Sequence, residues 1–155
     1  MLKLLPLLLL CTLLGHAAEE IVTLAAVGDV MLGRGVPARI ASHGPAWPWD
    51  ALQPELARAD LRFCNLECAV TTGGIRIPKP YSFRVDPAMA GEALRAGGFN
   101  VVSLANNHTY DYSRPGLADT IAAMDKLGVI APGAGCGRAG AIAPKLVTRN
   151  DLTIA

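Results

Sequence analysis

The chain has 155 residues, which is the size of one ordinary domain. It carries 14 Lys and Arg against 13 Asp and Glu, and its formal net charge of +1 excludes a protein that binds nucleic acid through a large basic excess. Hydrophobic residues make up 52% and charged residues 17% of the chain, a composition that excludes an intrinsically disordered protein.

The first 17 residues have the pattern of a secretory signal peptide. Lys3 precedes an apolar run from Leu4 to Leu14, and the short segment Gly15-His16-Ala17 follows that run. We therefore expect cleavage after Ala17 or Ala18 and export of the mature chain to the periplasm, the cell surface or the extracellular space. The alternative is an uncleaved membrane anchor, although the apolar run is shorter than the roughly 20 residues of a transmembrane helix.

Three apolar segments predict the strands of a largely parallel sheet. They are residues 21–27, 61–64 and 100–105, and continuous apolar runs of this length are typical of strands that are covered on both faces. Each run is followed by carboxylate, amide or imidazole side chains, in the segments Gly28-Asp29, Asn65-Leu66-Glu67 and Asn106-Asn107-His108. These polar residues mark the carboxyl ends of the predicted strands.

Helical patterns separate the predicted strands. Apolar residues recur at helical spacing within residues 50–59 and 115–127. Asp86-Pro87 provides an N-cap and a first helical residue for a further helix, which ends at Gly97-Gly98. Strands that alternate with helices predict an α/β fold with a largely parallel sheet.

The last part of the chain contains a glycine-rich loop and a predicted hairpin. The loop 133–137 has backbone N–H groups that could cradle a phosphate, but it lacks the Lys and Ser/Thr of a nucleotide-binding loop. Asn150-Asp151 predicts a turn between the strand-like segments 143–148 and 152–155. Because the chain ends inside a predicted strand, we expect the sequence to be part of a longer, truncated domain.

Three cysteines follow the predicted signal peptide, and their odd number argues against a disulfide framework. They are Cys64, Cys68 and Cys136. Cys64 and Cys68 lie four residues apart at the end of a predicted strand, so we expect them to face the same side. We expect buried small hydrophobic residues, with a single disulfide as the alternative.

The polar residues at the strand ends predict a metal site. The carboxyl ends of parallel strands share one edge of a sheet, so Asp29, Glu67 and the pair Asn107-His108 should converge there. Carboxylate oxygens, amide oxygens and imidazole are ligands of hard or borderline divalent cations. Each residue alone also has an ordinary explanation, as a cap, a solvated strand end or a turn. Their coincidence at three strand ends favours the metal site.

These segments resemble the CapA family, bacterial proteins associated with the synthesis of poly-γ-glutamate capsules. The resemblance rests on Val27–Arg34 (VGDVMLGR), Asn65-Leu66-Glu67 and Ser103–His108 (SLANNH), with Asp111 and Gly116-Leu117 as further matches. It covers about residues 21–155 and implies a layered α/β fold similar to the calcineurin-like metallophosphoesterases. Residues 18–155 would be the N-terminal part of that domain, after the signal peptide at residues 1–17.

The resemblance also implies a role for each residue of the predicted site. Asp29, Glu67 and Asn107 would be ligands of a divalent metal ion, for which manganese, zinc and iron all remain open. His108 would be the proton donor beside the reacting group. Asp111 would orient His108 or line the site.

Three residues of a nearby family segment would bind an anionic substrate. They are Lys79, Tyr81 and Arg84, and the alternative is that they belong to a solvated loop. The implied partners are an anionic polymer such as poly-γ-glutamate or the components of a capsule synthase, and no nucleic acid is expected. Membrane contact is expected only through the N-terminal segment.

Two departures from the phosphoesterase pattern keep three functions open. Met31 stands where those enzymes carry the His of an Asp-x-His motif, and His43 and His108 are the only histidines after the predicted signal peptide. The first function is a metal-dependent hydrolase that acts on a phosphoester or on an amide-like bond of an anionic polymer. The second is a non-catalytic component that binds or guides the polymer. The third is an inactive truncated fragment.

Overall fold

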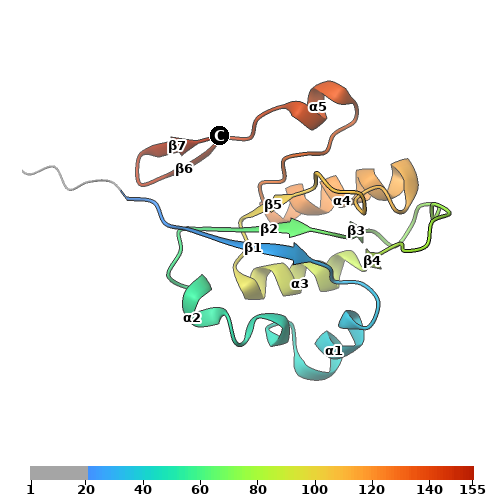
Figure 1. Cartoon of the computed structure of the whole chain (residues 1–155), viewed down its shortest axis with the longest axis horizontal. Coiled ribbons are helices and arrows are strands. Elements are labelled where there is room, and N and C mark those ends of the chain that lie inside the picture. The colour runs from blue at the N-terminus through green and yellow to red at the C-terminus, as the bar shows by residue number, and fades with distance from the viewer. Residues whose placement is uncertain (1–20) are drawn as a thin grey trace, which may run out of the picture.

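The computed structural model describes residues 21–155 of the chain (Figure 1). The predicted signal peptide at residues 1–17 lies outside the described residues, so its cleavage and the export of the chain stay predictions. Among the helices of the described part, none combines the length and the apolar composition needed to cross a membrane.

A parallel three-stranded sheet forms the centre of the domain. β1 (Leu24–Val30), β2 (Leu61–Leu66) and β5 (Val101–Ser103) lie in the order β1-β2-β5. A parallel bridge between Val101 and Ile130 continues the pairing beyond β5. The predicted α/β fold with a largely parallel sheet is confirmed, and the carboxyl ends of the strands share one edge.

β1 extends further toward this edge than the sequence predicts. The strand begins at Leu24 instead of Ile21 and continues through Asp29. Its pairing with β2 shifts by one residue between Ala26 and Asp29, which is a β-bulge. The bulge keeps the last residues of β1 paired, so Asp29 lies within the strand and opposite Asn65 instead of following the strand.

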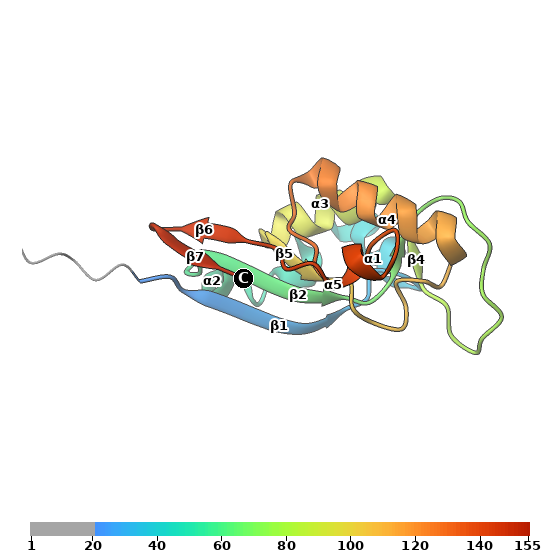
Figure 2. The ribbon, with the colours of Figure 1, turned by 90° about the horizontal axis from the view of Figure 1, so that it is seen from above.

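Two long helices cover one face of the sheet (Figure 2). α3 (Pro87–Gly97) begins as predicted, because the Asp86 carboxylate accepts hydrogen bonds from two N–H groups of its first turn. α3 ends at Gly98 and α4 (Ser113–Leu127) ends at Gly128, both in the left-handed conformation that glycine adopts readily. The buried faces of these helices and the strands form the core, which includes Leu66, Leu94, Val102, Leu104 and Met124.

The predicted helix over residues 50–59 is wrong in its extent. The segment follows a single turn of 3-10 helix, η1 (Trp47–Trp49), and contains only the short α2 (Gln53–Leu56). Pro54 lacks a backbone N–H, and its ring would collide with the carbonyl four residues earlier. A regular helix therefore cannot run through the whole segment.

Short elements surround the carboxyl edge of the sheet. α1 (Val36–His43) has no counterpart among the predicted elements, and it ends with an exposed His43, as expected for a surface residue. β3 (Ala69–Val70) and β4 (Arg84–Val85) pair in parallel. This pair brackets the loop 71–83, which carries two of the predicted substrate-binding residues.

The C-terminal segment lies over the other face of the sheet. It contains α5 (Arg138–Ile142) and the antiparallel hairpin of β6 (Val147–Arg149) and β7 (Leu152–Ile154). A groove of about 460 Å³ separates this segment from sheet residues that include Phe63. The predicted hairpin turn is confirmed, because Asn150 and Asp151 both have a positive φ, 47° and 59°, as a tight turn between twisted strands requires.

The cysteines of the described part are free, so the alternative of a disulfide is not formed there. Cys64 and Cys68 are buried as expected, whereas Cys136 is exposed. Burial raises the pKa of the Cys64 and Cys68 thiols from 9.0 to about 12, and for Cys64 the proximity of Cys68 adds to this rise. Both thiols are therefore neutral core side chains at physiological pH.

We expect the buried thiols to make the domain sensitive to alkali. The pKa of Cys64 is raised from 9.0 to about 12 in the folded protein, so its contribution to stability is fully present below pH 9 and is lost between pH 9 and pH 12. The free energy of unfolding should fall by about 1.4 kcal/mol for each pH unit above this threshold and for each buried thiol. Urea unfolding at neutral and at alkaline pH measures the fall.

Two cysteine variants test whether the buried thiols cause this loss of stability at alkaline pH. Cys64→Ala should lose less stability at alkaline pH than the unsubstituted chain, since one buried thiol no longer ionises. Cys136→Ala removes the exposed thiol and should behave like the unsubstituted chain. An identical alkaline loss in both variants would contradict the assignment.

Candidate functional site

Hydrogen bonds between side chains join the strand ends at the carboxyl edge of the sheet. Asn65 Nδ2 donates to Asp29 Oδ1 at 2.8 Å. Asn106 Nδ2 donates to Asn65 Oδ1 at 2.9 Å and to the Leu66 carbonyl at 3.0 Å. The three side chains come from β1, from β2 and from the loop after β5, so the edge is held by side chains as well as by the strand pairing.

Asn106 also shapes the loop that carries His108. Its Oδ1 accepts hydrogen bonds from the backbone N–H of His108 at 2.9 Å and of Thr109 at 3.0 Å. The neighbouring Asn107 is exposed, and its backbone carbonyl accepts a hydrogen bond from Lys79 Nζ at 2.7 Å. The family resemblance implies Asn107 as a ligand and gives Asn106 no role, because two adjacent asparagines carry no signal for which one turns inward.

His108 and Asp111 form a buried pair. His108 Nδ1 lies 2.8 Å from Asp111 Oδ2, which also accepts the backbone N–H of Phe83 at 2.6 Å. The Phe83 and His108 rings lie 4.2 Å apart between centroids. Because a carboxylate can only accept, we assign the proton to Nδ1, which leaves Nε2 with its lone pair. Nε2 is then the ring nitrogen that makes no hydrogen bond within residues 21–155.

Lys79 is part of the same cluster. Its ammonium forms an ion pair with Asp111 Oδ1 and lies 3.5 Å from His108 Nδ1. The Asp111 side chain is fully buried, while 26% of the Lys79 side chain is exposed. The cation therefore offsets a carboxylate that would otherwise be buried without a counter-charge. Lys79 therefore contacts the carboxylate that holds His108. This contact is not predicted from the sequence, where Lys79 is expected to bind the substrate.

The loop 71–83 is fixed to the start of α4 by its backbone. The Ile77 N–H donates to the Asp111 carbonyl at 2.8 Å. The Ile75 N–H donates to Ser113 Oγ at 3.2 Å. Gly74 has a φ of +78°, and a side chain there would collide with the backbone of Tyr112. The loop therefore approaches the turn beyond His108 as closely as the backbones allow.

Tyr81 and Arg84, the other two predicted substrate-binding residues, do not contact this cluster. Tyr81 is 64% exposed at the surface of the loop. The Arg84 guanidinium lies over the Tyr112 ring, 4.6 Å from its centroid, which is a cation–π contact. Neither side chain forms a hydrogen bond with His108 or Asp111 within residues 21–155.

The carboxyl edge leaves several oxygen atoms free. The Glu67 N–H donates to the Val30 carbonyl at 2.9 Å, which fixes Glu67 beside the end of β1. Asp29 Oδ2, the Glu67 carboxylate and Asn107 Oδ1 make no hydrogen bond within the described part of the chain. Such oxygen donors fit a hard divalent cation such as Mn²⁺. Residues 21–155 contain no group of three or more His, Cys, Asp and Glu side chains arranged for a metal ion, so a metal site at Asp29, Glu67 and Asn107 stays a prediction.

Comparison with known proteins gives a consistent set of relatives. Residues 23–155 match the family described as "Bacterial capsule synthesis protein PGA_cap". A protein of Mycobacterium tuberculosis named "Probable polyglutamine synthesis accessory protein" is 32% identical over 163 residues, which cover 83% of this chain and 43% of the relative. The "Capsule biosynthesis protein CapA" of Bacillus anthracis is 30% identical over 123 residues, which cover 77% of this chain and 30% of the relative.

A third relative has no assigned role. It is an uncharacterized protein of Sinorhizobium fredii, 31% identical over 141 residues that cover 86% of this chain and 30% of the relative. The chain thus spans less than half the length of each of these relatives.

We expect Lys79→Met to destabilise the domain, because the substitution leaves the buried Asp111 carboxylate without its cation. The loss should be about 2 kcal/mol in the free energy of unfolding, less than for a fully buried pair because Lys79 is partly exposed. Urea unfolding at neutral pH measures it. Lys145→Met, at an exposed lysine, should change the value by less than about 0.5 kcal/mol.

A double variant separates the charge effect from lost packing. Adding Asp111→Asn to Lys79→Met should restore part of the stability, because a neutral amide needs no counter-charge. If Lys79→Met is as stable as Lys145→Met, the ion pair does not support the site.

Proposed function

Because this chain belongs to the bacterial capsule synthesis family PGA_cap, we propose that it acts in the synthesis of an anionic capsule polymer, with the site around His108 as a hydrolytic centre. The names of two relatives, which refer to capsule biosynthesis and to polyglutamine synthesis, support the first part. The buried His108–Asp111 pair carries the second part, because it presents one imidazole nitrogen in a fixed orientation.

In this proposal His108 transfers a proton at Nε2. Asp111 holds Nδ1 at 2.8 Å and fixes both the tautomer and the plane of the ring. The Phe83 ring, 4.2 Å from the imidazole, excludes water from one face of it. Lys79 forms an ion pair with the Asp111 carboxylate, and this carboxylate stabilises the imidazolium that forms when His108 accepts a proton.

A divalent cation is proposed at the oxygen donors of the carboxyl edge. Asp29, Glu67 and Asn107 would hold it, and it would supply a bound water of lowered pKa beside the anionic group of the substrate. Its donors come from the ends of three neighbouring strands, which the Asn65 and Asn106 amides hold together.

We also propose that the mature protein works outside the cytoplasm. The support is the sequence of residues 1–17, with a lysine, an apolar run and small residues before the expected cleavage point.

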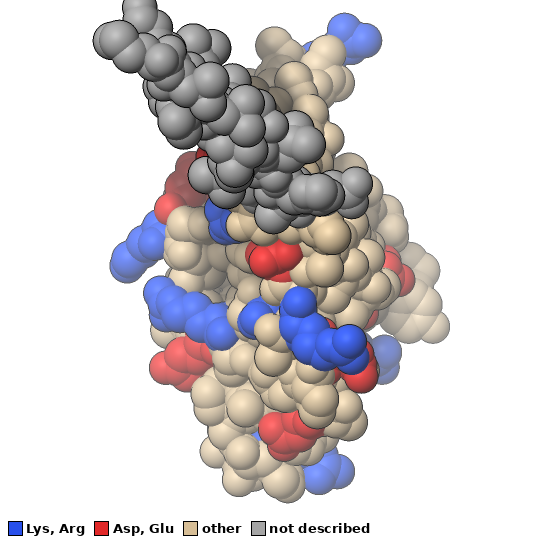
Figure 3. Space-filling view, turned by 90° about the vertical axis from the view of Figure 1, so that its left-hand side faces the viewer, with Lys and Arg blue, Asp and Glu red and all other residues tan. Residues whose placement is uncertain are grey.

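A second candidate function is non-catalytic binding of the polymer. Met31 favours it, because this residue replaces the histidine of the phosphoesterase pattern and its sulfur accepts the Gly33 N–H at 3.1 Å. The formal net charge of the chain is only +1, and the end of the molecule shown in Figure 3, where β1 begins, carries both basic and acidic side chains. Attraction of a polyanion would therefore depend on local contacts and not on the overall charge.

We expect His108→Ala to lower the hydrolysis of p-nitrophenyl phosphate in the presence of Mn²⁺ by about 100-fold or more, as for the loss of a general acid or base. The assay follows the release of nitrophenolate. His43→Ala, which removes the exposed histidine at the end of α1, should keep the activity of the unsubstituted chain. Equal turnover in the two variants would exclude His108 as the proton-transfer group and favour the non-catalytic candidate.

We expect Asp29→Asn to weaken the binding of Mn²⁺, because the substitution removes the charge of a proposed ligand while keeping its shape. Calorimetric titration should show an affinity lower by about tenfold or more. Asp125→Asn, at an exposed position of α4, is the control for the change in net charge and should bind Mn²⁺ as before. If both variants bind equally, the cation is not held at the end of β1.

A further inference from the structure

A groove lies directly beside the turn that carries His108. It has a volume of about 360 Å³ and runs between the first half of α4 and the glycine-rich loop 133–137. Its size is within the range of small-molecule binding sites. No carboxylate lines it, and its wall consists of Tyr110, Arg114, Leu117, Ala118, Ile121 and the loop residues 135–137.

Two glycines of this loop are required by packing. A side chain at Gly133 would collide with Ala105, and one at Gly135 would collide with the backbone of Gly140. The loop is therefore held against its neighbours, and it forms a fixed wall for the groove.

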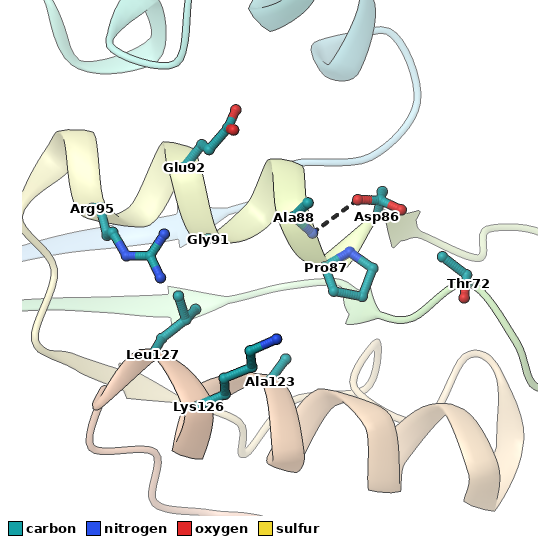
Figure 4. Close-up of a pocket in the computed structure, with 10 residues that line it drawn as sticks. All are labelled: Thr72, Asp86, Pro87, Ala88, Gly91, Glu92, Arg95, Ala123, Lys126 and Leu127. Atoms are coloured by element: carbon teal, nitrogen blue, oxygen red, sulfur yellow. Dashed lines mark hydrogen bonds between the residues drawn. The ribbon is translucent and has the colours of Figure 1, made fainter.

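Arg114 occupies a position that its helix does not favour. It lies in the first turn of α4, where the helix dipole is unfavourable for a cation, and it forms no ion pair within residues 21–155. A second groove, between α3 and α4, is lined by Arg95 and Lys126 (Figure 4). These two cations lie in the last turns of their helices, where the dipole stabilises them, so their presence needs no ligand.

Tyr110 connects the groove to the candidate active site. The Asp111 N–H donates to the His108 carbonyl at 3.1 Å, which closes a turn around Tyr110. The His108 and Asp111 side chains point inward and contact each other, whereas Tyr110 is 49% exposed and lines the groove. The turn 108–111 therefore has the His108–Asp111 pair on its inner side and the groove on its outer side.

We propose that this groove is a carboxylate-binding subsite, in which Arg114 binds a carboxylate of the capsule polymer. The inference rests on the proposed function for the identity of the ligand. A γ-linked glutamate chain carries one carboxylate per unit and two methylene groups in its backbone. The planar guanidinium matches the carboxylate, and Leu117, Ala118 and Ile121 match the methylene groups.

Cys136 provides a local readout, because it is exposed and lines the groove. The full chain is treated with iodoacetamide in the presence of increasing poly-γ-glutamate, and the modification of the Cys136 peptide is followed by mass spectrometry. We expect the polymer to slow this modification at least fivefold at saturation. In Arg114→Gln, the polymer concentration that gives half of the protection should rise by about tenfold or more, as for the loss of a charge-assisted hydrogen bond.

Two further variants complete the test. Arg39→Gln makes the same change in charge at an exposed residue of α1, and the polymer should protect Cys136 in this variant as in the unsubstituted chain. Arg114→Lys keeps the charge but loses the planar guanidinium that binds a carboxylate through two hydrogen bonds. Its half-protecting polymer concentration should therefore lie between those of Arg114→Gln and Arg39→Gln. The melting temperature of Arg114→Gln should not fall, since the helix dipole gives Arg114 no stabilising role there.

The outcomes are distinguishable from those of the hydrolysis assay. Unchanged modification of Cys136 at saturating polymer, or equal protection in Arg114→Gln and Arg39→Gln, would overturn the subsite. Absence of turnover in the unsubstituted chain, combined with Arg114-dependent protection, would reject the hydrolase and retain the subsite.

Discussion

The buried carboxylate of Asp111 is the group on which the arrangement of the candidate site depends. One oxygen accepts from His108 Nδ1 at 2.8 Å and from the Phe83 N–H at 2.6 Å, and the other forms the ion pair with Lys79. Its backbone carbonyl accepts the Ile77 N–H at 2.8 Å. A single charge, fully removed from water, thus fixes the imidazole and holds the loop 71–83 at Lys79 and at Phe83. Because an unpaired buried carboxylate is costly, the loss of any one of these contacts destabilises the others.

Much of the frame around this group follows from local sequence rules. The apolar runs predict the parallel strands, Asp86-Pro87 and Gly98 define the ends of α3, and Asn150-Asp151 defines the hairpin. In each case the chemistry that decides the structure lies within a few residues: a cap, a fixed proline φ, or a positive φ. The helix predicted over residues 50–59 is wrong because a single Pro54 outweighs an otherwise helical pattern.

The details of the site could not be read in the same way, because they depend on residues far apart in the chain. Lys79 meets Asp111 only after the loop 71–83 folds over α4, and nothing in its local sequence distinguishes it from a solvated lysine. Asn106 turns inward because its Nδ2 donates a hydrogen bond to Asn65 Oδ1. Asn65 lies 41 positions earlier in the chain, so the local sequence does not reveal this contact. The inward asparagine holds the edge together, and the outward one keeps its side-chain oxygen free.

The C-terminal hairpin has a consequence for how the chain is made. Asn150 Nδ2 donates to the carbonyl of Ile21 at 2.8 Å, a contact between residues 129 positions apart. During synthesis Ile21 leaves the ribosome 129 residues before Asn150, so it has to wait for this partner. Folding can begin earlier with the local helices and neighbouring strands, but this contact is necessarily a late event. Until it forms, the amino-terminal end of the first strand lacks this tether during translation.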